Sequence, residues 1–432
     1  MLARIGILGH VGNGNLGDEA TIQAVLQNFR VKSPQTEFRA FTMNPDDTRE
    51  RHGIPAFPVR RRPAAATGDA DLSAAHQAAP GWRARLKQVP LLGPLLRWLR
   101  DGAALGVTLL QETAFLGSSW RRLGGLNALF VIGSGQLNDY VGGPWQYPYT
   151  LLKWTVLARL RGVRVGFVSV GAGPIATPLG RRFIRWALRL AAYRSLRDED
   201  SRALLASLGV RGELFVTPDL AFSLDVTQTR TRPAGAIRVI GVNPLPYLDV
   251  NYWHASDATI YDRYVTNLAA CVKWLADAGH EVVLFPMQLR VDPGVIADVE
   301  RALAGIGGAS GRVRQARVTS VADVFTLLST LDAVVATRFH GMVAAFCSQL
   351  PAIGISYHPK AGELLTQMGQ SSYGIDIERL DPDTFRATFS RLEADADRVR
   401  HDLPGRVAAA RAVLAEQYDR LLAVFDRPGA AA

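Results

Sequence analysis

The chain contains little cysteine and no long apolar stretch. Only two of its 432 residues are cysteines, Cys271 and Cys347, and both stand within apolar segments that have helical spacing. We expect both to be buried as small hydrophobic residues, which argues against a disulfide framework or a cysteine-bound metal and indicates a reducing compartment. No run of 18 apolar residues occurs, so the sequence predicts no membrane-spanning helix.

The first residues lack the features of an export signal. The short apolar run at residues 4–8 comes almost directly after Met1. The three parts of an export signal, a basic region, a long apolar stretch and a small-residue cleavage site, do not occur together there. We therefore expect a cytoplasmic protein.

Acidic residues are fewer than basic ones, 39 against 49, which gives a formal net charge of +10. This charge suits a protein that meets phosphorylated metabolites, anionic lipid or nucleic acid, although an arginine-rich proteome would explain it as well. The basic residues are dispersed, and no helix-turn-helix, zinc-finger or RNA-binding signature occurs. A nucleic-acid partner is therefore not expected.

The length exceeds what one hydrophobic core usually supports, and it predicts two domains of roughly 200 residues each. Strand-like runs alternate with helical periods in both halves, and several strands end in glycine-rich loops. The polar, aperiodic stretch 225–236 is the predicted linker between a first domain at 1–224 and a second at 237–432. We expect an α/β fold with two Rossmann-type parallel-sheet domains that face each other across a cleft.

A basic insertion interrupts the first half at about residues 60–122. Its later part, 81–122, mixes leucine and tryptophan with basic residues and predicts two short amphipathic helices. These helices could lie on an anionic membrane surface or pack against the body of the domain.

Residues 9–20 read GHVGNGNLGDEA, three glycines followed by two acids. Glycines let the backbone approach a ligand closely, and the N–H groups of the following helix attract anions. Asp18 and Glu19 favour the helix dipole in that first turn but repel a phosphate, so the pattern indicates a loop that faces a sugar. Helix capping is the alternative. The candidates for binding hydroxyl groups are Asn13, Asn15, Asp18 and Glu19.

Small residues follow two later strands, in GSGQLNDY (133–140) and GAGP (171–174). Both segments suit close approach of the backbone to a ligand, although each could be only a tight turn. We expect Gly17 and Gly135 to lie beside the sugar. Asp219, in TPDLAF, is either a turn former or an acid that faces the cleft.

Basic residues stand at the ends of two strands in the second half. TRFHGM places Arg338 and His340 where a strand gives way to a helix, and SYHPK places His358 and Lys360 at the equivalent edge of the next strand. Cations gathered near helix N-termini suit a small molecule with two or three negative charges. The alternative is that His340 is a hydrogen-bonded core histidine and that Lys360 is solvated.

A further cation comes from the first half. SLRDEDS supplies Arg197 together with Asp198, which could orient it. An ion pair that only stabilises a turn is the other interpretation.

In combination, these motifs resemble the polysaccharide pyruvyl transferase family. The matching pieces keep the family's order over nearly the whole chain: GNLGDEA, IGSGQL, GAGP, SLRDEDS, PDLAF, RFHGMVAA and SYHPK. The resemblance implies a GT-B-like fold and transfer of a pyruvyl group from phosphoenolpyruvate to a sugar diol, as a cyclic ketal. It also implies that Arg197, His340 and Lys360 handle phosphoenolpyruvate. Two departures stand out: the usual triple glycine reads Gly133-Ser134-Gly135, and 60–122 carries no motif of the family.

The chemistry of the residues agrees with that implication. Phosphoenolpyruvate carries a phosphate and a carboxylate, so its site needs several cations. His340 is the candidate general acid that protonates C3, so that a hydroxyl can attack C2. A carboxylate of Asp18 or Glu19 could orient or deprotonate the diol, and no step requires a metal or a cofactor. The candidates for binding phosphoenolpyruvate are Arg197, Arg338, His340 and Lys360.

We therefore expect a transferase that acts on an exopolysaccharide or cell-envelope glycan precursor, lipid-linked at the cytoplasmic face of the inner membrane. The segment 81–122 would make the peripheral membrane contact. Two alternatives stay open: a GT-B glycosyltransferase that uses a nucleotide sugar, and a catalytically silent scaffold of a polysaccharide assembly complex.

Overall fold

The computed structural model describes residues 2–61, 110–140, 142–225, 235, 237–253, 256–308 and 311–426. The predicted linker therefore lies almost entirely outside the described residues. The segment predicted to meet a membrane is described only from residue 110 onward.

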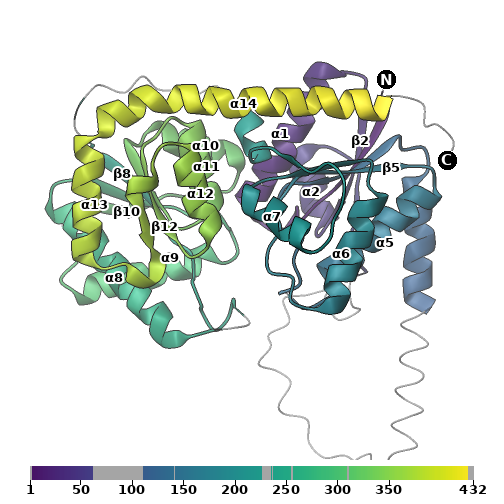
Figure 1. Cartoon of the computed structure of the whole chain (residues 1–432). Coiled ribbons are helices and arrows are strands. Elements are labelled where there is room, and N and C mark those ends of the chain that lie inside the picture. The colour runs from purple at the N-terminus through teal and green to yellow at the C-terminus, as the bar shows by residue number, and fades with distance from the viewer. Residues whose placement is uncertain are drawn as a thin grey trace, which may run out of the picture.

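Within the described residues, seven parallel strands form the sheet of the first domain (Figure 1). They are β1 (Arg4–Leu8), β2 (Glu37–Thr42), β3 (Ala56–Pro58), β4 (Ala128–Ile132), β5 (Arg164–Val170), β6 (Tyr193–Leu196) and β7 (Phe215–Val216). Their spatial order is β3-β2-β1-β4-β5-β6-β7. The helical elements are α1 (Leu16–Lys32), α2 (Pro45–His52), α5 (Tyr147–Leu160), α6 (Pro178–Leu190), α7 (Glu199–Ser207) and the 3-10 turn η2 (Leu220–Ser223).

Six parallel strands of the described chain form the sheet of the second domain. They are β8 (Val239–Asn243), β9 (Glu281–Leu284), β10 (Val313–Gln315), β11 (Ala333–Ala336), β12 (Ala352–Ser356) and β13 (Gly374–Asp376), in the order β10-β9-β8-β11-β12-β13. The helices are α8 (Ala258–Asp277), α9 (Asp292–Gly305), α10 (Val321–Ser329), α11 (Phe339–Cys347), α12 (Pro359–Gln367), α13 (Pro382–Ala394) and α14 (Ala396–Asp426). Two 3-10 turns, η3 (Ser371–Tyr373) and η4 (Ile377–Arg379), flank β13.

Both sheets reverse their strand order once, between β1 and β4 in the first domain and between β8 and β11 in the second. Ligands of doubly wound sheets bind beyond the carboxyl ends of strands at such reversals. The glycine-rich segment 9–15 follows β1, and the segment 133–135 follows β4. Arg338 directly precedes α11 after β11. The topology thus brings three of the predicted motifs to the two reversals, whereas Arg197 follows β6 and Lys360 follows β12.

Burial explains why the helical periods form where they do. In α8, Asp257 caps the first turn, and the buried side chains recur at helical spacing from Tyr261 to Ala276. Cys271 lies on this buried face, and Cys347 is buried in α11. The expected burial of both cysteines is confirmed.

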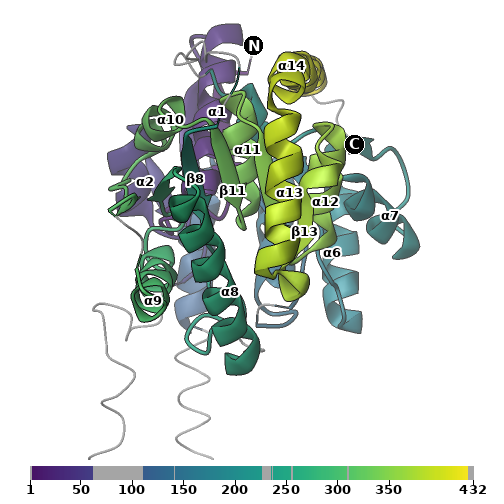
Figure 2. The same ribbon diagram turned by 90° about the vertical axis from the view of Figure 1, so that its left-hand side faces the viewer.

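The long helix α14 crosses from the second domain back to the first, along the top of the molecule in Figure 1. Its last turns pack there, because Tyr418 meets the Phe29 ring edge-on at 5.5 Å and Phe425 meets the Phe130 ring at 4.9 Å. Figure 2 shows α14 following α13 at the side of the second domain where the crossing begins. The domain boundaries predicted from the sequence assign all of 237–432 to the second domain and do not predict that the end of α14 packs on the first.

The described end of the basic insertion packs on the first domain. Residues 110–123 are helical, and Phe115 meets the buried Trp154 ring edge-on at 6.3 Å. Glu112 accepts a 2.8 Å hydrogen bond from Lys153. No described helix is long and apolar enough to cross a membrane.

Candidate active site

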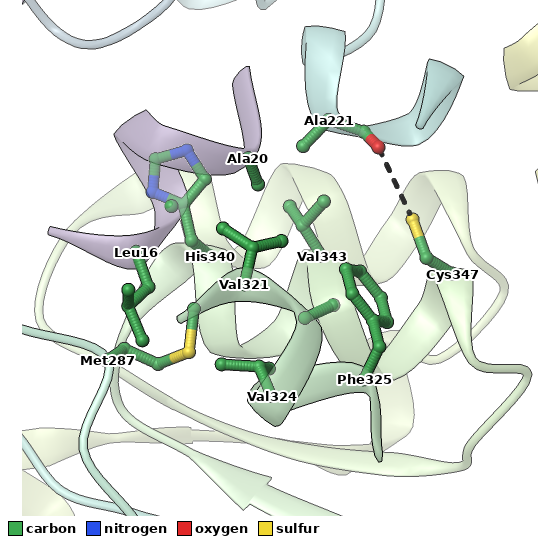
Figure 3. A pocket seen from close by; sticks show the side chains of 12 residues that line it. Leu16, Ala20, Ala221, Met287, Val321, Val324, Phe325, His340, Val343 and Cys347 are labelled. Atoms are coloured by element: carbon green, nitrogen blue, oxygen red, sulfur yellow. Dashed lines mark hydrogen bonds between the residues drawn. The ribbon is translucent and has the colours of Figure 1, made fainter. Parts of the chain in front are cut away.

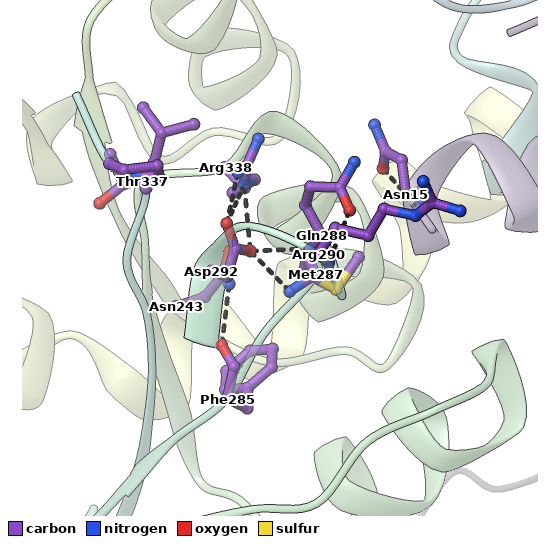
Figure 4. Close-up of polar contacts among 12 residues, drawn as sticks. Asn15, Asn243, Phe285, Met287, Gln288, Arg290, Asp292, Thr337 and Arg338 are labelled. Atoms are coloured by element: carbon purple, nitrogen blue, oxygen red, sulfur yellow. Dashed lines mark hydrogen bonds and ion pairs between the residues drawn. The ribbon is translucent and has the colours of Figure 1, made fainter. Parts of the chain in front are cut away.

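Hydrogen bonds join the loop between β1 and α1 to the segment 287–289 of the second domain (Figure 4), and we call these contacts the interdomain clamp. The Leu16 backbone N–H donates to the Met287 carbonyl at 2.8 Å, and the Leu289 N–H donates to the Gly14 carbonyl at 2.8 Å. The Gln288 side-chain amide also donates to the Asn13 carbonyl at 3.0 Å. Gly14 has a φ of +72°, which a side chain would strain.

The Asn15 side chain caps α1, because its amide oxygen accepts from the Gly17 N–H at 3.0 Å. Asn13 joins the clamp through its backbone. The Asn13 backbone and the Asn15 side chain thus have structural roles at this contact, and the predicted contact of both residues with the acceptor stays a prediction.

Arg338 and Asp292 form the ion pair that supports the same clamp. The guanidinium meets both carboxylate oxygens of Asp292, with Nε at 3.0 and 3.1 Å. Asp292 is fully buried and also accepts from the Met287 and Gln288 N–H groups, at 2.9 and 2.8 Å. Because the Arg338 charge is already neutralised, we assign Arg338 to the clamp instead of to phosphoenolpyruvate.

The two acids at the start of α1 differ in their surroundings. Glu19 is buried, and its two oxygens accept from the Gly12 N–H at 2.8 Å and meet His52 Nε2 at 2.7 Å. Both oxygens are thus occupied, which favours a structural role for Glu19. Asp18 is buried as well, but its Oδ2 lies 3.4 Å from Nδ1 of the partly exposed His10, so Asp18 remains the candidate for the acceptor side.

Gly17 lets the start of α1 touch the His340 imidazole. A Cβ atom at Gly17 would lie 2.1 Å from His340 Cγ and 2.2 Å from Nδ1, so only glycine fits there. Figure 3 shows the His340 ring beside the start of α1, at one end of a small apolar cavity between the domains. Gly17 thus positions the predicted acid, and the expectation that it contacts the acceptor stays untested.

Asp219 joins the two domains at the centre of the site. Its Oδ2 lies 3.2 Å from Arg197 Nη1 and 3.5 Å from His340 Nε2, while Oδ1 accepts from the Ala221 N–H at 3.0 Å. Burial alone would raise the pKa of Asp219, but the nearby His340 and Arg197 hold it well below its usual range. Asp219 therefore orients these two residues, which is a different role from the predicted contact with the acceptor.

Arg197 emerges from the end of β6 into tight surroundings. Its guanidinium carbon lies 4.2 Å from the centre of the Phe339 ring, and a Cβ atom at Gly171 would lie 3.1 Å from its Nη2. The absence of a side chain at Gly171 of the GAGP motif therefore leaves room for the Arg197 guanidinium. The Nε atom is 3.7 Å from Asp198 Oδ2 and has no hydrogen-bond partner in the described chain.

Lys360 approaches Arg197 from the second domain. It lies in the first turn of α12, which His358 caps by accepting from the Lys360 N–H at 3.3 Å. Glu363 of the same helix accepts from the Glu199 N–H at 3.0 Å and so ties α12 to the first domain. Burial and, next, the charge of Arg197 lower the pKa of Lys360 to about 8, and burial lowers that of His358.

The segment after β4 lies beside this cluster. Gly133 and Ser134 have φ values of +45° and +55°, and the Ser134 carbonyl accepts from the Gly171 N–H at 2.8 Å. A Cβ atom at Gly135 would meet nothing within 4 Å. Gly135 therefore borders open space, which leaves room for the predicted acceptor.

The structure thus places Arg197, His340 and Lys360 where the two domains meet, and their contact with phosphoenolpyruvate stays a prediction. Sequence reasoning missed the link through Asp219, the Asp292 partner of Arg338 and the pairing of His10 with Asp18. A usable signal existed only for His10, because a histidine with nearby acids in a glycine-rich loop is a candidate for acid–base chemistry.

The sequence matches the model of one family, polysaccharide pyruvyl transferase, over residues 15–359. Curated proteins give no match.

Solved structures with a similar fold are enzymes of nucleotide sugars and a glycosyltransferase. One is the UDP-GlcNAc 2-epimerase of Neisseria meningitidis, 11% identical, with a TM-score of 0.56 over 96% of this chain and 99% of that one. A glycosyltransferase of Rickettsia africae ESF-5 is 8% identical, with a TM-score of 0.54 over 99% of both chains. These likenesses show the fold alone, and they confirm the expected GT-B-like arrangement of two parallel-sheet domains.

Proposed function

Because the chain belongs to the polysaccharide pyruvyl transferase family, we propose that it transfers the pyruvyl group of phosphoenolpyruvate to a sugar diol of a glycan precursor. The product is a cyclic pyruvate ketal, and phosphate is released. One observation carries the proposal: Arg197 and His340 meet at Asp219 from different domains, Lys360 lies near Arg197, and the buried Nε atom of Arg197 has no hydrogen-bond partner in the described chain. A buried donor of this kind suits an anionic ligand.

Arg197 and Lys360 bind the donor in this proposal. The guanidinium offers a planar fork that matches a carboxylate or a phosphate, and the ammonium adds a point charge. Lys360 suits the role because its side chain makes no hydrogen bond or ion pair with another described residue. Since Arg197 belongs to the first domain and Lys360 to the second, the donor binds where the domains meet.

His340 is the general acid of the reaction. It delivers a proton to C3 of the enol, which makes C2 electrophilic as the first acceptor hydroxyl attacks. A second hydroxyl then bonds to C2 while the bond from C2 to the phosphate oxygen breaks. Two hydroxyl protons are lost, one proton is gained by C3 and one leaves with phosphate, so the reaction balances without an oxidant or another reactant.

The acceptor lies on the side of Asp18 and Gly135. The open space at Gly135 leaves room for a sugar ring. Tyr140 packs on Gly173 of the GAGP motif, and 60% of its surface is exposed, so its ring is available to stack on a sugar.

A lipid-linked acceptor at the cytoplasmic face of a membrane remains part of this proposal. It rests on the composition of the basic segment 81–122, whose leucine, tryptophan and basic residues suit an anionic lipid surface.

The proposal is tested with the purified full chain, phosphoenolpyruvate and a panel of diol-bearing glycan lipids and nucleotide sugars. We expect phosphate release that depends on an acceptor, and a product that gains a carboxyethylidene group by mass spectrometry. His340→Gln should slow transfer by about 10²–10⁴-fold, the usual contribution of a general acid. No phosphate release with any acceptor, together with binding of a nucleotide diphosphate, would favour a nucleotide-sugar glycosyltransferase instead.

A further inference from the structure

Two histidines contact the acids at the start of α1, His10 from the β1–α1 loop and His52 from the end of α2, and their surroundings differ. His52 Nε2 lies 2.7 Å from Glu19 Oε2, and only 5% of the His52 side chain is exposed. His10 Nδ1 lies 3.4 Å from Asp18 Oδ2, and 23% of its side chain is exposed. The first pair is closed off from ligands, whereas the second retains an accessible imidazole edge.

The contact with Asp18 decides which nitrogen of His10 is free to react. A carboxylate only accepts hydrogen bonds, so the imidazole nitrogen that faces it, Nδ1, carries a proton. In the neutral ring Nε2 then holds a lone pair and can accept a proton from a ligand. An acid that fixes a histidine through Nδ1 is the arrangement by which general bases are oriented in hydrolases.

A neighbouring phenol lies beside the His10 ring. The Tyr147 ring centre lies 5.7 Å from that of His10, and the Arg60 guanidinium carbon lies 4.5 Å from the centre of Tyr147. Burial raises the pKa of Tyr147, so its phenol stays neutral and protonated. The His10 ring therefore contacts an acid through Nδ1 and lies beside an aromatic ring, and its Nε2 makes no hydrogen bond with another described residue.

This pair stands next to the predicted acid. Gly17 touches the His340 ring, and Asp18 is the following residue in the same helical turn. His10 and His340 thus flank the first turn of α1, one held by Asp18 and the other by Asp219. A reaction that must add a proton to one carbon and remove protons from two hydroxyls requires an acid and a base in such proximity.

We propose that His10, oriented by Asp18, is the general base that takes the proton from the first acceptor hydroxyl. The inference rests on the proposed function. The hydroxyl proton moves to His10 Nε2 as the oxygen bonds to C2 of phosphoenolpyruvate, and C3 receives its proton from His340. Asp18 touches no reacting atom in this step and is a positioning residue.

The test compares variants of the two histidines in the active full chain. His10→Asn keeps an amide N–H in place of Nδ1 for the contact with Asp18, but it removes the base. We expect kcat to fall about 10²-fold or more while the Kd for phosphoenolpyruvate changes less than about threefold. His52→Asn is the matched control, and it should leave kcat within about fivefold once the melting temperature shows that the variant is folded.

Chemical rescue separates catalysis from structure. Added imidazole should restore transfer to His10→Ala in a saturable manner, and it should leave His52→Ala and the wild type unchanged. Asp18→Asn should lower kcat in the wild-type background, but it should lower it no further in His10→Asn, since the two act together.

The inference is overturned if His10→Asn keeps wild-type kcat, or if imidazole fails to rescue a folded His10→Ala. Failure of the proposed function is a different result, because wild-type protein would then release no phosphate from phosphoenolpyruvate with any acceptor.

Discussion

The carboxylate of Asp219 lies 3.5 Å from Nε2 of His340, although the two residues belong to different domains. The same oxygen lies 3.2 Å from Arg197. One buried acid therefore orients a cation from the first domain and the imidazole from the second. The arrangement exists only when the domains meet, so we expect the reaction to depend on their closed packing.

Replacing Asp219 by asparagine should destabilise the protein. Breaking a buried ion pair by removing one partner costs about 3–5 kcal/mol, since it leaves the other charge uncompensated. The pKa of Asp219 is held below its ordinary value, so its stabilisation is present above that value, about 3.9, and is lost as the pH falls below it. Urea unfolding of wild type and Asp219→Asn from pH 7 to pH 3 checks this. A stability difference that is absent at pH 7, or that does not shrink below about pH 4, would contradict the assignment.

Replacing Gly17 by alanine should disturb catalysis more than folding. The added Cβ would lie 2.1 Å from His340 Cγ, so the imidazole must move. We expect kcat to fall by about 10-fold or more, because small displacements of a catalytic group cost large factors in rate. Gly405→Ala in α14 is the control, since a Cβ atom there would meet nothing within 4 Å and alanine favours a helix by about 1 kcal/mol. Equal kcat values in the two variants would show that His340 does not need its observed position.

Much of this architecture could be predicted from the sequence, because strand and helix periods are local. The alternation of apolar runs and glycine loops predicts two parallel-sheet domains, and the ends of β6, β11 and β12 carry the predicted Arg197, His340 and Lys360. Parallel strands end at one edge of their sheet, which explains why residues far apart in sequence could be assigned to one site.

The partners of the polar side chains could not be predicted in this way. Asp292 reaches Arg338 from another helix, and Asp219 reaches His340 across the domain boundary. These contacts depend on how the two domains pack, and the spacing of apolar residues within a single helix or strand does not predict that packing. The end of α14 was missed for the same reason, because the apolar face that it covers belongs to the first domain.

Arg338→Lys should affect stability more than donor binding. Lysine keeps the charge, but it cannot make the forked contact with both oxygens of Asp292. We expect a lower melting temperature, and a KM for phosphoenolpyruvate within about threefold of wild type. A KM that rises by tenfold or more in a variant of unchanged stability would indicate that Arg338 binds the donor.

The activity should fall as the pH rises through about 8, where Lys360 loses its proton in the free protein. The proposed donor is an anion, so we expect the ammonium form to bind it and the neutral amine not to. The value of kcat/KM for phosphoenolpyruvate should therefore drop about tenfold per pH unit above pH 8. Arginine stays charged throughout this range, so Lys360→Arg should lose the part of the decline that belongs to Lys360. An identical pH profile in wild type and Lys360→Arg would assign the titration to another group.

Calorimetric titration of the full chain with phosphoenolpyruvate tests the central claim most directly, namely that cations from both domains hold one small anion. Saturable binding is expected for wild type, and Arg197→Met and Lys360→Met, one from each domain, should each weaken it by at least tenfold, about 1.4 kcal/mol. Arg386→Met, at an exposed position on α13, should bind as wild type does. Wild-type protein that binds no phosphoenolpyruvate, or variants that bind it with unchanged affinity, would contradict the account.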